Sequence, residues 1–164
     1  MNIILLGKSA SGKDYTSNLL VKQGYEKIIS YTTRPMRSNE KEGIDYYFVD
    51  LDTMLDMIKN HELLEYRVYH TVYGDWYYGV KKEENIDNKV IITDVQGCKE
   101  WIKEYGRDKF KIYYLDCKDK VRLERAKNRD KGFDMREWKR REKDDKKKFK
   151  WREIKKIGGE KVKC

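Results

Sequence analysis

Apolar residues along this chain follow two different spacings, and stretches of the two kinds alternate. Compact apolar runs predict buried parallel strands at 2–6, 89–93 and 110–115. Apolar residues three or four positions apart predict helices at 13–22, 51–60 and 96–105, and mostly helical structure from residue 118 onward with a break near Gly132. Strands and helices that alternate in this way are typical of an α/β domain with a largely parallel sheet.

The segment 34–80 departs from that alternation. It is rich in tyrosine, and only one helix interrupts it, with Asp50 or Asp52 available as the N-cap. Short strands are predicted at 26–33, 45–50, 63–69 and 76–80, the last two joined by a turn at Gly74-Asp75. We therefore expect a small subdomain inserted into the parallel core. Residues 156–163 carry no comparable pattern and are expected to form a frayed tail.

The composition is typical of one folded, highly charged domain. The 164 residues are 38% hydrophobic and 41% charged, and 13 Tyr and 4 Trp argue against disorder. No stretch reaches the roughly 18 apolar residues of a membrane span, and the opening MNIILLG lacks the features of a signal peptide. Cys98, Cys117 and Cys164 are odd in number and lack zinc spacing. We expect the three cysteines to be reduced thiols in a cytoplasmic protein, which neither form a disulfide nor bind a metal.

The excess positive charge is confined to one region. The net charge is +9, yet residues 118–156 hold 19 Lys+Arg against 9 Asp+Glu, so the remainder is close to neutral. Such a block serves as a solvated face, a nucleic-acid patch or a clamp for a polyphosphate. The densest part, 139–152, exceeds what a clamp needs. We expect it to be a solvated helix face, and nucleic acid is not the expected partner.

The stretch GKSASGKD (7–14) follows the first apolar run and precedes the first helix. Glycines let the backbone turn so that successive N–H groups face phosphate oxygens, and Lys13 adds a positive charge toward the β- and γ-phosphates. The following helix offers its N-terminus to the same anion. This context predicts a nucleotide site formed by Gly7, Ser9, Ala10, Ser11, Gly12, Lys13 and Asp14.

Asp14 stands where such a loop usually has the Ser or Thr that binds Mg²⁺. A carboxylate is also a hard oxygen ligand, so Asp14 is the candidate metal ligand, directly or through water. Its negative charge near the phosphates requires neighbouring cations to offset it. The substitution bears more on metal geometry than on nucleotide binding.

A second segment, TTRPMRSNEKEGIDYYFV (32–49), is more specific. It closely resembles the nucleoside-monophosphate-binding signature of the guanylate kinase family, through Thr32, Thr33, Arg34, Arg37, Glu40, Gly43, Tyr46 and Phe48. The resemblance extends to HELLEYRVY and WYYG, to TDVQG (93–97) and to RLERAKNR (122–129), and covers roughly residues 1–145. It implies an α/β P-loop kinase with a parallel sheet core flanked by helices, an inserted nucleoside-monophosphate-binding subdomain and a helical lid.

The resemblance also implies roles for particular residues. It assigns the acceptor phosphate to Ser30, Arg34, Arg37, Tyr46 and Tyr78, and counts Glu40 among the substrate-binding residues. Glu65 and Asp94 would face guanine, because a carboxylate accepts hydrogen bonds from both N1–H and the exocyclic amine. Thr71 and Tyr73 are both candidates for a hydroxyl that donates to guanine. Lys13 would act in catalysis together with the lid arginines Arg125, Arg129 and Arg140.

The implied reaction is ATP-dependent phosphorylation of GMP or dGMP with Mg²⁺, by a monomer or homodimer. The implied divisions are a core at 1–33 and 81–120, an insert at 34–80, a lid at about 121–142 and a basic C-terminal helix and tail at 143–164. The family's strand with an adenine-contacting Asn has no counterpart here, so no residue is assigned to adenine.

Two other functions are compatible with parts of this pattern. Related kinases that phosphorylate ribose bisphosphates can carry Gly-Lys-Asp in the loop, but they would not need Glu65, Asp94 and the full signature from Arg34 to Phe48. Scaffold domains resembling guanylate kinases have lost the ATP loop, whereas this chain keeps Gly7, Gly12 and Lys13.

Overall fold

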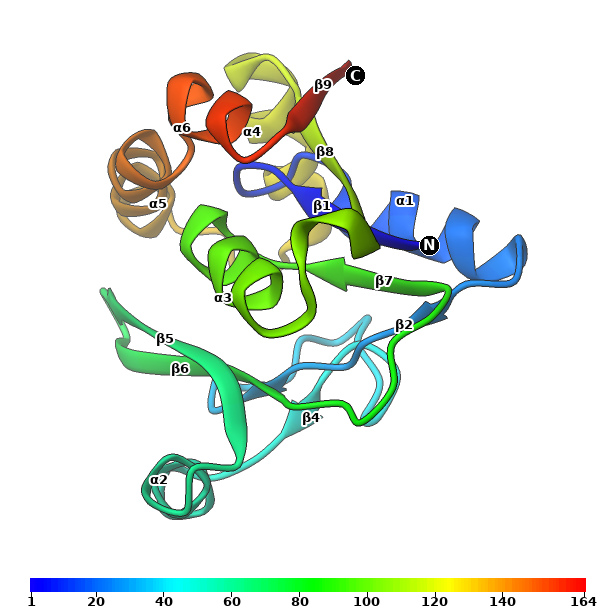
Figure 1. Cartoon of the computed structure of the whole chain (residues 1–164). Coiled ribbons are helices and arrows are strands. Elements are labelled where there is room, and N and C mark those ends of the chain that lie inside the picture. Colours follow the sequence, from blue (N-terminus) through cyan, green and yellow to red (C-terminus); the bar gives the residue numbers. More distant parts are fainter. The chain divides into compact units, whose positions relative to one another are not determined.

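A five-stranded parallel sheet lies at the centre of the first of two units (Figure 1). The computed structural model describes all residues from 1 to 164, and this unit consists of 1–27 and 86–164. The strand order is β2 (Glu26–Lys27), β7 (Lys89–Ile92), β1 (Asn2–Leu6), β8 (Phe110–Asp116) and β9 (Gly159–Lys163). All five residues of β1 are buried, as expected for a central strand with both faces covered.

Helices flank this sheet and were mostly predicted from the sequence. They are α1 (Lys13–Lys22), α3 (Val95–Tyr105), α4 (Asp119–Arg129), α5 (Met135–Lys148) and α6 (Trp151–Lys156), with a 3₁₀ turn at Arg107–Lys109. Leu20 of α1 packs on a cluster formed by Ile3, Leu5 and Val90. Trp101 of α3 is fully buried. No helix is both long and apolar enough to cross a membrane.

The last strand corrects two predictions. Residues 156–163 were expected to be a frayed tail, but β9 pairs with β8 in parallel from Ile112↔Gly159 to Asp116↔Lys163. The pairing uses backbone groups at a sheet edge, so the polar sequence gave no sign of it. Cys117 and Cys164 follow these neighbouring strands and form a disulfide, where reduced thiols were expected. Parallel strands in register bring the two cysteines together.

The second unit comprises residues 28–85 and contains the expected insert within its bounds. Its four-stranded sheet has the order β4 (Tyr47–Phe48), β3 (Tyr31–Thr32), β6 (Gly74–Lys81) and β5 (Leu63–Thr71). The single strand expected at 26–33 is therefore split, with β2 in one sheet and β3 in the other.

Two details of the second unit differ from the sequence pattern. The turn between β5 and β6 consists of Val72 and Tyr73, because Thr71 already pairs with Gly74; it does not lie at Gly74-Asp75. Asp50 is the N-cap of helix α2 (Leu51–Lys59), and its side chain accepts a hydrogen bond from the Thr53 N–H at 2.8 Å. This confirms one of the two predicted caps. Met54 and Met57 are its buried residues, whereas Leu51 and Leu55 are exposed.

Candidate functional site

The loop between β1 and α1 folds back on itself. The Ser11 N–H donates to the Lys8 carbonyl oxygen at 3.2 Å. Gly12 has φ 93° and ψ 20°, a left-handed conformation that glycine reaches without steric cost, and Ala10 also has a positive φ of 59°. A Cβ atom on Gly7 would collide with Ser11 Oγ. The loop leads straight into the N-terminus of α1, an arrangement that suits an anion such as phosphate.

Lys13 places its ammonium group across this loop. Its Nζ atom donates to the carbonyl oxygens of Gly7 at 2.7 Å and of Lys8 at 3.1 Å. Burial lowers the pKa of Lys13, while the carboxylates of Asp145 and Asp14 oppose that shift. The positive charge is therefore held inside the loop by the loop's own carbonyl groups and two acids.

Asp14, the candidate metal ligand, lies in the first turn of α1 and is exposed. Its Oδ1 atom is 3.2 Å from the Nζ atom of Lys27. No group of three or more His, Cys, Asp or Glu residues in the structure is arranged to hold a metal ion. A single exposed carboxylate fits a Mg²⁺ ion that takes its other ligands from phosphates and water.

Two buried side chains that the sequence analysis did not single out contact the loop. Asp145 of α5 is 7% exposed and accepts a hydrogen bond from the Ser9 N–H at 2.8 Å. Arg122 of α4 is 0% exposed and donates to the Ser9 carbonyl oxygen at 3.2 Å. The same guanidinium donates two hydrogen bonds to the carboxylate of Glu142, at 2.6 and 2.9 Å. It donates one more to Asp119, at 2.7 Å.

These contacts tie helices α4 and α5 to the loop and to each other. Burial opposes the charge of Arg122, but the hydrogen bonds with Glu142 and Asp119 outweigh it, so the pKa of Arg122 is raised. The Arg122 side chain is thus a permanent cation whose donors are directed at the loop and at two acids. Its role is to position the loop.

Two of the three predicted lid arginines have acidic partners. Arg129 contacts the adjacent Asp130 at 2.9 Å. Arg140 donates to Glu137, one turn away on α5, and lies 3.6 Å from Asp144. An incoming phosphate must compete with these carboxylates for either guanidinium.

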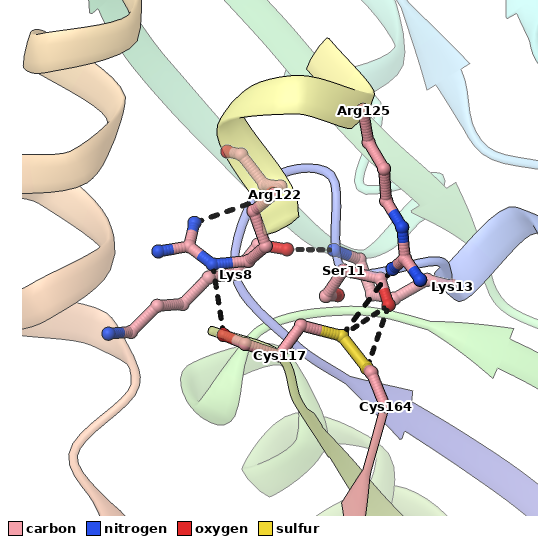
Figure 2. Close-up of a disulfide and its surroundings, with 8 residues drawn as sticks. Lys8, Ser11, Lys13, Cys117, Arg122, Arg125 and Cys164 are labelled. Carbon is pink, nitrogen blue, oxygen red and sulfur yellow. Dashed lines mark hydrogen bonds between the residues drawn. A yellow bond between two sulfur atoms is a disulfide. The ribbon is translucent and has the colours of Figure 1, made fainter. Parts of the chain in front are cut away.

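Arg125 differs from the other two lid arginines because no carboxylate pairs with it. It is exposed on α4, and its Nη1 atom lies 3.5 Å from Cys117 Sγ. A Cβ atom placed on Gly12 would be 3.4 Å from the same nitrogen. Figure 2 shows Arg125, Lys13 and Ser11 around the disulfide. Arg125 therefore adds an uncompensated positive charge next to the loop.

A second cluster lies within the unit 28–85 and is centred on Arg34. The guanidinium of Arg34 makes two hydrogen bonds to the carboxylate of Glu40, at 2.8 and 2.7 Å. It also lies over the rings of Tyr46 and Phe48, 5.3 and 5.9 Å from their centroids. Burial works against the charge of Arg34, but the hydrogen bond to Glu40 outweighs it and raises the pKa of Arg34.

Glu40 is held in its ionised form by the same cluster. Burial alone would raise the pKa of Glu40, but hydrogen bonds from the Arg34 side chain and the Arg37 N–H lower it. Glu40 thereby fixes Arg34, and the structure gives it the role of a positioning residue. The predicted direct contact of Glu40 with substrate stays a prediction.

An aromatic group surrounds the cluster. The ring of Tyr46 meets those of Phe48 and Tyr78 edge to face, with centroids 5.7 and 5.9 Å apart, and Tyr78 meets Tyr69 in the same way at 5.3 Å. The carbonyl oxygen of Ser30 accepts from the Tyr47 N–H at 2.9 Å. The structure thus brings Arg34, Arg37, Tyr46 and Tyr78 together: Tyr78 lies on β6, and the other three lie in the connection between β3 and β4.

The predicted guanine-facing residues have the following surroundings. Glu65 of β5 is 8% exposed, and its Oε2 atom lies 3.8 Å from Arg67 Nη2. Thr71 is engaged at the hairpin turn, where its Oγ1 atom donates to the Gly74 carbonyl oxygen at 2.6 Å. Asp94, in the first unit, caps helix α3 by accepting from the Gly97 N–H at 2.8 Å.

Comparison with known proteins identifies the family. The sequence model of the family described as guanylate kinase matches residues 1–151, which include both the phosphate loop and the Arg34 cluster. This chain belongs to the guanylate kinase family. The resemblance noted in the sequence, and the P-loop kinase fold that it implied, are confirmed.

Individual guanylate kinases are similar over part of their length. That of Anaplasma phagocytophilum is 38% identical over 104 residues, covering 58% of this chain and 48% of the relative. That of Bacteroides thetaiotaomicron is 37% identical over 119 residues, covering 68% and 57%. The crystal structure of the Anaplasma phagocytophilum guanylate kinase matches with a TM-score of 0.58 and 30% identity, over 76% of this chain and 65% of that one. The chain spans about half of the length of these curated relatives.

Within this member of the guanylate kinase family, Arg122 and Asp145 are the site residues that sequence reasoning missed. Arg122 is one of many basic residues in a helical segment, and Asp145 is one of two consecutive acids. Their partners on the loop are 113 and 136 positions away in sequence. A buried arginine and a buried aspartate have no local sequence signal that separates them from exposed neighbours.

Proposed function

We propose that this protein transfers the γ-phosphoryl group of ATP to GMP or dGMP, giving ADP and the nucleoside diphosphate. The observation that carries the proposal is the family match over residues 1–151, because it spans the loop and the Arg34 cluster together. Each of these is a phosphate-binding arrangement, and a phosphotransferase needs one for the donor and one for the acceptor.

The donor side is supplied by the first unit. The backbone of the loop and the N-terminus of α1 would hold the phosphates of ATP, with Lys13 directing its charge at the β- and γ-phosphates. To do so, the ammonium exchanges its bonds to the Gly7 and Lys8 carbonyls for bonds to phosphate oxygens. Arg125 is the lid arginine best placed to join it, because no carboxylate competes for its guanidinium.

The acceptor side is supplied by the second unit. Glu40 holds Arg34 in place through two hydrogen bonds. Arg34 would then bind the acceptor phosphate together with Arg37, Tyr46 and Tyr78. Glu65 would accept hydrogen bonds from guanine N1–H and the exocyclic amine, with Thr71 as a hydroxyl donor. Adenine presents an acceptor where guanine presents N1–H, so it would leave the carboxylate without a donor.

Catalysis on this proposal is positioning and charge cancellation. The acceptor phosphate is already ionised, so no general base is needed, and the arginines and Lys13 offset charge that moves between the phosphates. A Mg²⁺ ion held through Asp14 and the nucleotide would add charge neutralisation between the β- and γ-phosphates. We further propose a cytoplasmic location and a monomer or homodimer.

One assay tests the proposal. ADP formation is measured with ATP and Mg²⁺ and, in turn, GMP, dGMP, AMP, CMP, UMP and a ribose bisphosphate. We expect turnover with GMP or dGMP and at least a hundredfold lower kcat/KM with AMP, because sites built to pair a polar edge reject analogues by up to about 10⁴–10⁵. Turnover with the ribose bisphosphate alone would overturn the proposal in favour of that related kinase activity. No turnover with any acceptor would overturn it as well.

A further inference from the structure

The disulfide between Cys117 and Cys164 lies against the phosphate loop (Figure 2). The carbonyl oxygen of Ser11 is 3.1 Å from Cys117 Sγ and 3.6 Å from Cys164 Sγ. The Nη1 atom of Arg125 is 3.5 Å from Cys117 Sγ. One disulfide therefore lies against both the loop and Arg125, the predicted lid arginine that no carboxylate pairs with.

The two sulfur atoms are not equivalent. Cys117 follows β8 and is 7% exposed, whereas Cys164 follows β9 and is exposed. Cys164 is therefore the more accessible residue of the pair, and Cys117 is shielded. The guanidinium beside Cys117 stabilises a departing thiolate at that position. An accessible sulfur joined to a stabilised leaving sulfur is the arrangement that thiol–disulfide exchange requires.

We propose that Cys117 and Cys164 form a reversible redox site that sets the affinity of the phosphate loop for ATP, with the disulfide form binding ATP more tightly. The proposal takes its ligand and the cytoplasmic location from the proposed function. Cytoplasmic disulfides are usually transient and redox-sensing, because the thiol pool there is reducing.

The exchange is balanced with glutathione as the co-reactant. A glutathione thiolate attacks Cys164 Sγ, a mixed disulfide forms there, and the S–S bond to Cys117 breaks. The Cys117 thiolate that leaves takes up a proton. A second glutathione attacks the mixed disulfide and releases Cys164 as a thiol and glutathione disulfide. Two electrons pass from two glutathione molecules to the cysteine pair, and the reverse sequence restores the bond.

Reduction of the disulfide would affect the loop through the contacts of Cys117 with Ser11 and Arg125. In the disulfide neither sulfur carries a hydrogen, and both are held in place against the Ser11 carbonyl. In the dithiol form no bond joins Cys117 to Cys164, so the two sulfurs can separate and move away from that carbonyl. A loop that is already ordered loses less conformational entropy on binding ATP than a loop that becomes ordered only when ATP binds. β9 pairs with β8 through backbone groups over five residues, and we expect that pairing to keep the reduced protein folded.

The experiment measures ATP binding by titration calorimetry on the protein of residues 1–164, oxidised with glutathione disulfide or reduced with glutathione. Thiol alkylation and mass spectrometry report the fraction in the disulfide form. We expect the reduced protein to bind ATP about fivefold or more weakly, the lower end of typical coupling between sites. GMP-dependent ADP formation, measured in parallel, tests the proposed function independently.

Thermodynamic linkage supplies a second readout. If the disulfide form binds ATP fivefold more tightly, saturating ATP must favour the disulfide by the same factor. The midpoint potential of the cysteine pair should then become more negative by about 20 mV in glutathione buffers containing ATP.

Two variants make the test specific. Cys164→Ser should bind ATP like the reduced protein under all conditions, without a response to oxidant. Cys98→Ala, which removes the cysteine outside the disulfide, should keep the full response. Equal ATP affinity in the two redox states, weaker binding by the disulfide form, or a response that persists in Cys164→Ser would overturn the proposal. Absence of ATP binding in both states would overturn it together with the proposed function.

Discussion

Lys13 illustrates how much depends on one side chain in the loop. We predict that Lys13→Ala lowers kcat for GMP-dependent ADP formation by about 10²-fold or more, because its charge offsets the charge that moves during transfer. Circular dichroism should show an intact fold. Lys22→Ala, at the exposed far end of α1, is the control and should retain activity. Near-native turnover in folded Lys13→Ala would contradict the assignment of the loop.

The role of Asp145 in positioning the phosphate loop follows from its hydrogen bond with the Ser9 N–H. Asp145→Ala leaves the Ser9 N–H without its acceptor, so we predict a loss of about 1.5–3 kcal/mol in the free energy of unfolding. We also predict a raised KM for ATP with little change in the KM for GMP. Asp145→Asn keeps an oxygen acceptor and should recover most of the ATP affinity.

The matched control for Asp145 is its neighbour. Asp144→Ala removes surface ion pairs with Arg140 and Lys148, 3.6 and 3.3 Å away, and such pairs contribute only about 0–1 kcal/mol. Steady-state kinetics and urea unfolding distinguish the variants. If Asp145→Ala and Asp144→Ala behave alike, Asp145 does not position the loop.

At the scale of elements, α4 carries two arginines with different tasks. Arg122 is buried and joins α4 to α5 and the loop, while Arg125, one turn later, is exposed and has no acidic partner. The first is a structural link whose donors are occupied. The second has donors available for a phosphate.

We therefore predict that Arg125→Ala lowers kcat by about 10²-fold while the KM for GMP changes little, since the guanidinium would meet the transferring group only in the transition state. Arg136→Ala, an exposed arginine paired with Asp134 on α5, should leave kcat unchanged. The measurement is initial rates at saturating ATP over a range of GMP. An effect confined to the KM for GMP would move Arg125 out of the reacting site.

At the scale of the whole molecule, the disulfide joins residues 47 positions apart, and most of the helical basic region lies between them. Cross-linking a loop of that length restricts the unfolded chain. We predict that Cys164→Ser lowers the free energy of unfolding by about 2–4 kcal/mol under oxidising conditions. Urea unfolding with and without a reductant measures this. The wild type and variant should coincide in reductant, and coincidence without it as well would show that the disulfide does not form.

Much of this protein could be predicted from local sequence. The buried strands and long helices were apparent because apolar spacing reports directly on which face of an element is covered. The phosphate loop and the 32–49 segment were apparent because their functional residues are contiguous. A cap at Asp50 or Asp52 was also apparent from local chemistry, and the structure selects Asp50. The assigned roles of Glu65, Asp94 and the lid arginines remain predictions.

The amino-acid sequence by itself determined the α/β class, the loop and the family, since each rests on short-range spacing. Tertiary structure alone decided that Gly159–Lys163 is a strand, that Cys117 and Cys164 meet, and that Asp145 contacts Ser9. The physical reason is the same in each case. Backbone pairing at a sheet edge has no side-chain signature, and a contact between residues 47 or 136 positions apart is created only by the path of the chain between them.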